Sequence, residues 1–236
     1  MIRRPLLLAS ALLAALGLSG CKEEAATSQA AATTAAAGSP AAENFQWKMV
    51  TAWPKNYPGL GTSAERLAER VKTMSNGRLT IKVYAGGELV PPLEAFDAVS
   101  RGTAELGHGA AYYWKGKVPA AQFFTAVPFG LSTPEMNAWL SKGGGQALWE
   151  EAYAPHGVKP LAVGNTGMQM GGWYNKEINS LDDLKGLKIR MPGLGGEVLS
   201  KLGATTVNLP GGEVFTALQT NAIDATDWVS PYNDLA

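Results

Sequence analysis

Arg190 is the residue whose surroundings in the sequence most clearly suggest chemistry. It belongs to a short apolar segment, Leu187 to Met191, that is followed at once by Pro192 and a glycine-rich stretch. The segment predicts a strand that stops at Pro192, because proline cannot donate a hydrogen bond to a neighbouring strand. In α/β sheets ligands bind at the carboxyl ends of strands, and a guanidinium presents a rigid fork of donors that suits a carboxylate. The position of Arg190 therefore favours a carboxylate site.

A second interpretation of the same segment is open. Leu187, Ile189 and Met191 alternate with Lys188 and Arg190, and such alternation of apolar and polar residues is typical of a half-exposed strand. In that case Arg190 would face solvent and would need no ligand.

Other polar and aromatic side chains fall close to the ends of predicted strands. The aromatic run Tyr112-Tyr113-Trp114 follows a short strand around residues 105–109, and its rings could wall a pocket or pack into the core. Gln169 stands between two methionines, so its amide either serves a ligand or faces solvent. Asp227 and Trp228 close an apolar strand that begins near Ala222. Each position suits a ligand site and also a structural role.

Signatures of enzymes and metal centres have little support in the sequence. The two histidines, His108 and His156, lack the spacing of metal ligands, and a structural or surface role is favoured for both. We find no phosphate-binding loop, no nucleophile elbow and no paired cysteine. Asp224 and Asp227 could act as an acid–base pair, but acidic residues are common at strand ends.

Alternating helix and strand patterns place the chain in the α/β class. A strand from Phe45, a helix with a capping box at Thr62 and Glu65, and a strand over residues 79–83 form a β-α-β unit with parallel strands. A helix over 92–101 and the strand near 105–109 follow. Later, Ser132 with Glu135 and Ser180 with Asp183 mark helix starts.

The second half repeats the alternation. The strand at 187–191 leads through a glycine bend into a helix over 197–202, then a helix over 213–220 and a strand over 222–229. Residues 158–163 and 168–174 are expected to be strands that cross between two lobes.

The N-terminus has the pattern of an export signal. Arg3 and Arg4 precede an apolar run too short to span a bilayer, and Leu18-Ser19-Gly20-Cys21 resembles a lipobox. We expect residues 1–21 to be a lipoprotein signal with Cys21 lipidated, the alternative being an ordinary secretory signal. Residues 22–44, rich in alanine and threonine, predict a disordered tether. The formal net charge is zero without a basic cluster, so nucleic acid is not expected as a partner.

Three motifs together resemble a known family. They are Asn165 to Trp173 (NTGMQMGGW), Leu184 to Pro192 (LKGLKIRMP) and Ile223 to Trp228 (IDATDW). The sequence from Phe45 onward resembles the extracytoplasmic solute-binding proteins of tripartite ATP-independent periplasmic (TRAP) transporters, and is similar above all to the branch that binds 2-oxo acids with a sodium ion. The resemblance implies a two-lobed α/β fold with hinge strands, residues 45–166 forming the first lobe and 167–236 a second lobe that is incomplete at its C-terminus.

The resemblance also implies roles for individual residues. Arg190 would hold the substrate carboxylate, and Tyr112 would reach the ligand from the first lobe. Gln169 would contact both substrate and cation, Asp227 would ligate the cation, and Trp228 would help to enclose cation and ligand. The branch is expected to carry glutamate at position 227, so the shorter aspartate leaves calcium open as an alternative to sodium.

The resemblance implies a periplasmic receptor, not an enzyme, that delivers a small carboxylate to the membrane permease subunits of a TRAP transporter. Another organic acid, such as a hydroxy acid or an aromatic carboxylate, is an alternative ligand. A secreted α/β enzyme is a further alternative, which would need acid, base or metal groups that the sequence does not display.

Overall fold

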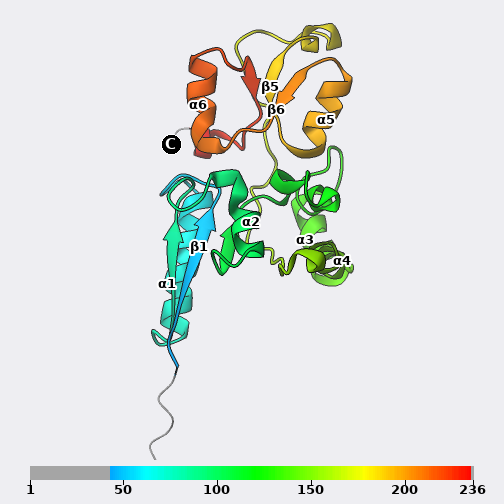
Figure 1. Ribbon diagram of the computed structural model, residues 1–236. Helices are drawn as coiled ribbons and strands as arrows, with labels where there is room; N and C mark the ends of the chain where they lie inside the picture. Colours follow the sequence, from blue (N-terminus) through cyan, green and yellow to red (C-terminus); the bar gives the residue numbers. More distant parts are fainter. Residues whose placement is uncertain (1–42, 235–236) are drawn as a thin grey trace, which may run out of the picture. The chain divides into compact units, whose positions relative to one another are not determined.

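The computed structural model describes residues 43–234 and contains two sheets (Figure 1). The predicted signal peptide, Cys21 and nearly all of the predicted tether lie outside the described residues. Within 43–234, no helix is long and apolar enough to cross a membrane. The first sheet has the order β2-β1-β3, with strands β1 (Phe45–Thr51), β2 (Leu79–Tyr84) and β3 (Leu106–His108). The second has the order β4-β7-β5-β6, with β4 (Trp173–Tyr174), β5 (Lys188–Arg190), β6 (Thr205–Val207) and β7 (Ala225–Thr226).

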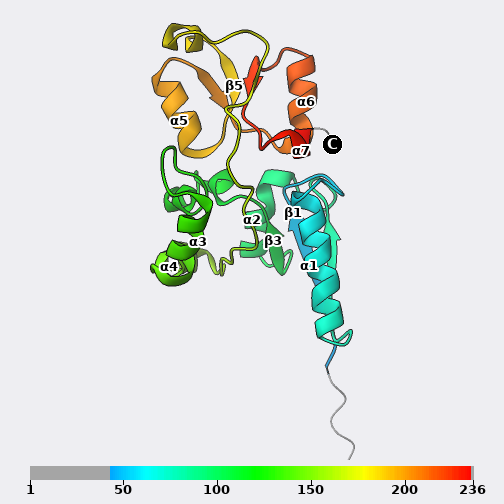
Figure 2. The same ribbon diagram turned by 180° about the vertical axis from the view of Figure 1, so that it is seen from behind.

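Both sheets follow the same path. In the first, helix α1 (Leu60–Met74) leads from β1 to its parallel neighbour β2, and α2 (Ala95–Ser100) precedes β3, which pairs with the other edge of β1. In the second, α5 (Gly193–Lys201) leads from β5 to β6, and α6 (Gly211–Gln219) leads to β7 on the other edge of β5. Right-handed crossovers in opposite directions place successive helices on opposite faces, and α5 and α6 flank the strands in both views (Figures 1 and 2).

This topology creates a switch point in each sheet. The chain leaves β1 toward one edge and returns on the other, and it does the same around β5. The crevice at the carboxyl ends of such central strands is where open α/β sheets bind ligands. The topology therefore directs attention to the residues that directly follow β1 and β5.

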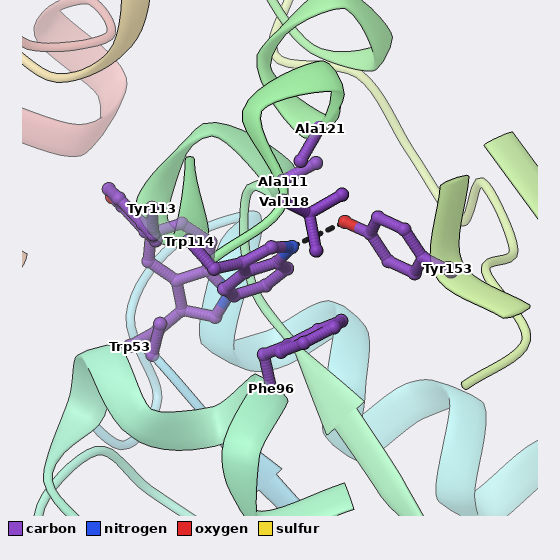
Figure 3. Packing of buried hydrophobic residues seen from close by; sticks show 9 residues of the cluster. Trp53, Phe96, Ala111, Tyr113, Trp114, Val118, Ala121 and Tyr153 are labelled. Carbon is purple, nitrogen blue, oxygen red and sulfur yellow. Dashed lines mark hydrogen bonds between the residues drawn. The ribbon is translucent and has the colours of Figure 1, made fainter. Parts of the chain in front are cut away.

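An aromatic cluster anchors the segment that carries the tyrosines (Figure 3). Phe96 of α2 stacks on Trp114 with ring centroids 5.5 Å apart, and the Tyr153 ring meets Phe96 edge-on at 5.1 Å. The Trp114 indole N–H donates a hydrogen bond to the Tyr153 hydroxyl. Because Trp114 is fixed on two sides, the 3-10 helix Ala111–Trp114 has a defined orientation that also fixes Tyr112 and Tyr113.

The helices before the second sheet agree with the sequence in part. The capping box of Ser132 and Glu135 opens α3 (Thr133–Lys142), and α4 (Gly145–Tyr153) follows. The box of Ser180 and Asp183 is also present, although it opens a 3-10 helix, Leu181–Leu184. The box predicted at Thr62 is wrong: α1 begins at Leu60, and the Thr62 amide already donates to the Tyr57 carbonyl.

The two predicted crossing strands are the largest error of the sequence analysis. Residues 158–163 form no strand, and of 168–174 only Trp173–Tyr174 pairs, with β7. Gly167 and Gly172 have φ angles of 77° and 118°, which break the extended conformation that pairing needs. Among the described residues, no strand lies beside 158–163, and hydrophobic alternation alone does not make a strand without a partner.

The glycine-rich stretch after Arg190 is the first turn of α5, and the predicted bend before a helix at Glu197 is wrong. The helix begins at Gly193. A Cβ at Gly196 would lie 2.2 Å from the Met191 carbonyl oxygen, so only glycine allows the helix to pack this closely against the end of β5. The close approach keeps the carboxyl end of β5 in place.

We predict that Gly196→Ala destabilises the protein by about 1–3 kcal/mol, because the new methyl group collides with backbone that cannot move freely. Urea denaturation of the full chain measures the effect. Gly212→Ala is the matched control: Gly212 also lies in the first turn of a helix, α6, but its nearest contact would be an ordinary 3.5 Å to Pro54. Equal stability of the two variants would contradict this account of the glycines.

Candidate functional site

Arg190 is buried, with 1 % of its surface exposed. It lies at the carboxyl end of β5, the strand that has β6 on one side and β7 on the other. Central strands of parallel sheets are covered on both faces. The alternation of polar and apolar residues along β5 therefore does not expose Arg190 to solvent. The half-exposed interpretation is therefore wrong, and a buried guanidinium needs partners of its own.

The guanidinium has polar partners on all three nitrogens. Its Nε donates to the Leu209 carbonyl at 3.1 Å, and Nη2 donates to the Tyr113 hydroxyl at 3.3 Å. Nη1 donates to the Asp227 carboxylate Oδ1 at 2.8 Å and to the Asp227 carbonyl at 3.4 Å. The Trp228 ring covers the guanidinium, with Cζ 4.9 Å from the ring centroid, a cation–π contact.

Burial dominates the electrostatics of this group. It raises the pKa of the Asp227 carboxyl, and the neighbouring Arg190 lowers that pKa by less. Burial acts against the charge on Arg190, but Tyr113, Asp227 and Tyr112 together outweigh it and raise the pKa of the guanidinium. Burial also raises the pKa of the Tyr112 and Tyr113 hydroxyls. The site thus holds the protonated Arg190 guanidinium, the poorly solvated Asp227 carboxylate and two neutral tyrosine hydroxyl groups.

Tyr112 and Tyr113 belong to the 3-10 helix that follows β3 of the first sheet. Their rings meet edge-on, with the ring centroids 4.9 Å apart. Tyr112 packs against Gly193 at the start of α5, where a Cβ would lie 3.1 Å from the tyrosine Cβ. Tyr113, which the sequence analysis did not single out, bonds to Arg190. The choice between the two neighbours depends on the 3-10 geometry of Ala111–Trp114, and no sequence pattern indicates it.

Trp228 belongs to a second network that joins distant segments. Its indole N–H donates to the Tyr57 hydroxyl at 2.8 Å, and that hydroxyl donates to the Asn233 carbonyl at 3.0 Å. The Asn233 amide in turn donates to the Pro58 carbonyl at 2.6 Å. Tyr57 was also missed from the sequence, since a tyrosine in a loop after a strand carries no signal of its own. These bonds hold the loop after β1 against the segment after β7.

Gln169 lies apart from this group of side chains. It is exposed, and its amide donates to the Thr166 hydroxyl at 2.9 Å. Its neighbour Met170 donates a backbone hydrogen bond to Val229 at 3.2 Å, so the segment runs beside the residues that follow β7. The structure brings the segment of Gln169 near the site but leaves the amide outside the Arg190 hydrogen bonds.

The other polar candidates have structural roles. Asp224 Oδ2 accepts a hydrogen bond from the Lys188 amide at 2.9 Å, at the opposite end of β7 from Asp227, so the two carboxylates form no acid–base pair. His108 Nδ1 accepts from the Trp53 indole at 2.9 Å, and His156 packs edge-on against Phe96. Within residues 43–234, no group of three or more His, Cys, Asp or Glu could hold a metal ion.

A cavity of about 470 Å³ opens beside the carboxyl ends of β5 and β6. Its lining comes from the β5–α5 turn, one face of α5, the end of β6 and Lys115, which pairs with Glu197 of α5 at 2.8 Å. Met191, the neighbour of Arg190, is part of its wall. Arg190, Tyr113, Asp227 and Trp228 do not line it, so the cavity lies beside the strand of Arg190 and not at the guanidinium itself.

Comparison with known proteins identifies the family. Residues 49–234 match the family described as bacterial extracellular solute-binding protein, family 7. The chain belongs to this family. The resemblance to TRAP solute-binding proteins is thereby confirmed, and so is the two-lobed α/β fold that these proteins share.

Individual members are closely similar. A monocarboxylate 2-oxoacid-binding periplasmic protein of Nostoc sp. (strain PCC 7120) is 53 % identical over 193 residues, which are 81 % of this chain and 52 % of that protein. A TRAP solute-binding protein of Pseudoalteromonas atlantica with bound sodium and pyruvate is 48 % identical, with a TM-score of 0.80 over 82 % of this chain and 59 % of the other. One from Colwellia psychrerythraea with bound calcium and pyruvate is 49 % identical, with a TM-score of 0.79 and the same coverage. The chain spans about half the length of the curated relatives it matches.

We predict that Tyr57→Phe costs about 1–2 kcal/mol of stability, because the Trp228 indole and the Asn233 carbonyl both lose a partner. Urea denaturation of the full chain provides the measurement. Tyr232→Phe is the control, since the Tyr232 side chain is half exposed and its hydroxyl makes no hydrogen bond within residues 43–234. If Tyr57→Phe lowers the free energy of unfolding no more than Tyr232→Phe does, the Tyr57 hydrogen bonds do not contribute to stability.

The pKa of His108, lowered by burial, predicts a pH dependence of stability. Below a pH of about 6.5 His108 binds a proton in the unfolded chain but stays neutral in the folded protein. The free energy of unfolding is therefore largest above that pH and falls as the pH drops. His108→Gln should flatten this slope in pH-dependent melting. A slope unaffected by His108→Gln would contradict the prediction.

Proposed function

We propose that this protein is a periplasmic receptor that captures a small 2-oxo acid together with a cation and delivers the acid to the permease subunits of a TRAP transporter. The observation that carries the proposal is the buried Arg190 guanidinium at the switch point of the second sheet. The relatives with pyruvate and sodium or calcium support it, because they share nearly half of the aligned residues.

The site offers what a buried carboxylate needs. Moving a carboxylate out of water costs several kcal/mol unless charge and hydrogen bonds replace the lost hydration. Arg190 supplies the charge, and the neutral hydroxyls of Tyr112 and Tyr113 supply donors that do not repel an anion. Trp228 covers the guanidinium and would enclose the ligand against it.

A cation fits the residues that are present. Arg190, Asp227 and a bound oxo acid together would leave one negative charge in a buried site, which a monovalent cation cancels. Asp227 carries an oxygen, Oδ2, that accepts no hydrogen bond within residues 43–234, and burial raises its pKa. The cation would supply positive charge to Asp227 and to the oxo acid. Gln169 and Trp228 lie on the adjoining segments and would add oxygen ligands, Gln169 through its side-chain amide and Trp228 through its backbone carbonyl. Sodium is our first choice and calcium the alternative, since calcium accepts more oxygen ligands at longer range.

Binding between the two sheets would couple capture to closure. Tyr57, Tyr112 and Tyr113 come from one side and Arg190 and Trp228 from the other. A ligand that contacts both sides favours the closed arrangement by its differential affinity, and a membrane permease can recognise that state. The boundary between lobes at residues 166 and 167, and attachment to the membrane through a lipid on Cys21, are parts of the same proposal.

A different organic acid is the second candidate. The family fold serves this candidate equally well, since a buried guanidinium such as Arg190 can hold the acid group of a hydroxy acid or an aromatic carboxylate as it would that of a 2-oxo acid. A secreted enzyme is not favoured, because no described acid–base pair or nucleophile accompanies the guanidinium.

The test is isothermal titration calorimetry of the full chain with Arg190→Lys. Lysine keeps the charge but loses the two-pronged geometry, so affinity for pyruvate in sodium should fall by about 100-fold or more, the scale of two charge-assisted hydrogen bonds. Lys188→Arg, two residues earlier on the same strand and exposed, is the control. Unchanged affinity of Arg190→Lys would overturn the carboxylate assignment, and longer 2-oxo acids titrated in parallel decide the ligand size.

A further inference from the structure

The hydrogen bonds of Arg190 leave little room for a ligand carboxylate. A guanidinium has five N–H groups, one on Nε and two on each Nη. Nε is used by Leu209, and the two acceptors of Nη1 both belong to Asp227. On Nη2 one acceptor is the Tyr113 hydroxyl. Within residues 43–234 a single N–H of Arg190 therefore has no partner.

A carboxylate bound in the two-pronged manner needs two neighbouring N–H groups. One can come from Nη2, and the other has to come from Nη1, where Asp227 Oδ1 lies 2.8 Å away. The Asp227 side chain is therefore an internal competitor of the same chemical class as the ligand. Its negative charge also repels an incoming acid.

We infer that Asp227 blocks Arg190 until a cation draws the aspartate carboxylate away, so that the cation binds first and the oxo acid second. The inference rests on the proposed function and adds the order of events to it. Without the cation, an acid has to displace Asp227 from Arg190 and leave that carboxylate buried without a partner, which is costly.

The backbone around Asp227 restricts this exchange to the side chain. The Asp227 amide donates to the Arg190 carbonyl at 3.0 Å. The Asp227 carbonyl accepts from the Thr226 hydroxyl at 2.8 Å, in addition to its longer bond from Arg190. With the main chain held at both groups, rotation of the carboxylate is enough to release Nη1. A hard cation that prefers carboxylate oxygen would hold the rotated position.

The experiment compares Asp227→Asn with wild type by calorimetry of pyruvate in sodium chloride and in choline chloride of equal ionic strength, using the full chain. In choline, Asp227→Asn should bind pyruvate about tenfold more tightly than wild type, because a neutral amide competes less for a charged donor. Its affinity should also be nearly independent of sodium. Asp224→Asn is the matched control: the same substitution at the other end of β7, at the carboxylate that accepts a hydrogen bond from the Lys188 amide, should keep the sodium dependence of wild type.

Two results would overturn the inference. One is a wild type that depends on sodium while Asp227→Asn binds no better than wild type in choline, which would make Asp227 a cation ligand only and leave the proposed function intact. The other is wild-type binding that is equally tight in both salts.

A second measurement needs neither a variant at Asp227 nor an oxo acid. Nitrogen-15 resonances of the Arg190 guanidinium, assigned by their loss in Arg190→Lys, should shift when sodium alone is added to wild type, because Nη1 loses its carboxylate partner. Choline should leave them unchanged. Resonances that do not respond to sodium or to calcium would overturn the exchange. Failure of every oxo acid to bind, with the resonances still shifting, would sink the proposed function alone.

Discussion

The ion pair between the buried Arg190 and the partly buried Asp227 is the interaction on which the rest of the site depends. A guanidinium with 1 % exposure is tolerated only if its donors find acceptors. The Leu209 carbonyl, the Tyr113 hydroxyl and Asp227 provide these acceptors at 2.8–3.4 Å. Leu209 follows β6, Asp227 follows β7, and Tyr113 belongs to the 3-10 helix Ala111–Trp114, so Arg190 connects segments that are far apart in sequence.

The position of the pair follows from the topology of the sheets. In the first sheet the chain starts with the central strand β1 and adds one neighbour on each side. In the second sheet it forms the edge strand β4 first and then does the same around β5. The carboxyl ends of β1 and β5 are therefore both switch points. The Trp228–Tyr57 hydrogen bond connects the residues that follow β7 to the loop that follows β1. The glycines at the start of α5 allow the helix to approach β5 closely.

Sequence patterns predicted the helices and strands and the position of Arg190 better than they predicted which side chains are in contact. Strands β1, β2 and β5 and the boxes at Ser132 and Ser180 follow from alternation and capping. The strand predicted at 158–163 is absent, because strand pairing depends on a partner strand that a local sequence pattern cannot reveal. Tyr57 and Tyr113 escaped notice for a related reason: their bonds to Trp228 and Arg190 join residues 171 and 77 positions apart. Which side chains meet at a switch point is a property of the tertiary fold.

The central claim is that Arg190 receives the ligand carboxylate at the carboxyl end of β5. A crystal structure of the full chain grown with sodium and pyruvate tests it most directly. The account predicts both carboxylate oxygens within hydrogen-bond distance of Nη1 and Nη2 of Arg190, with Asp227 turned toward the cation. Pyruvate bound elsewhere, with the bond between Arg190 and Asp227 intact, would contradict it.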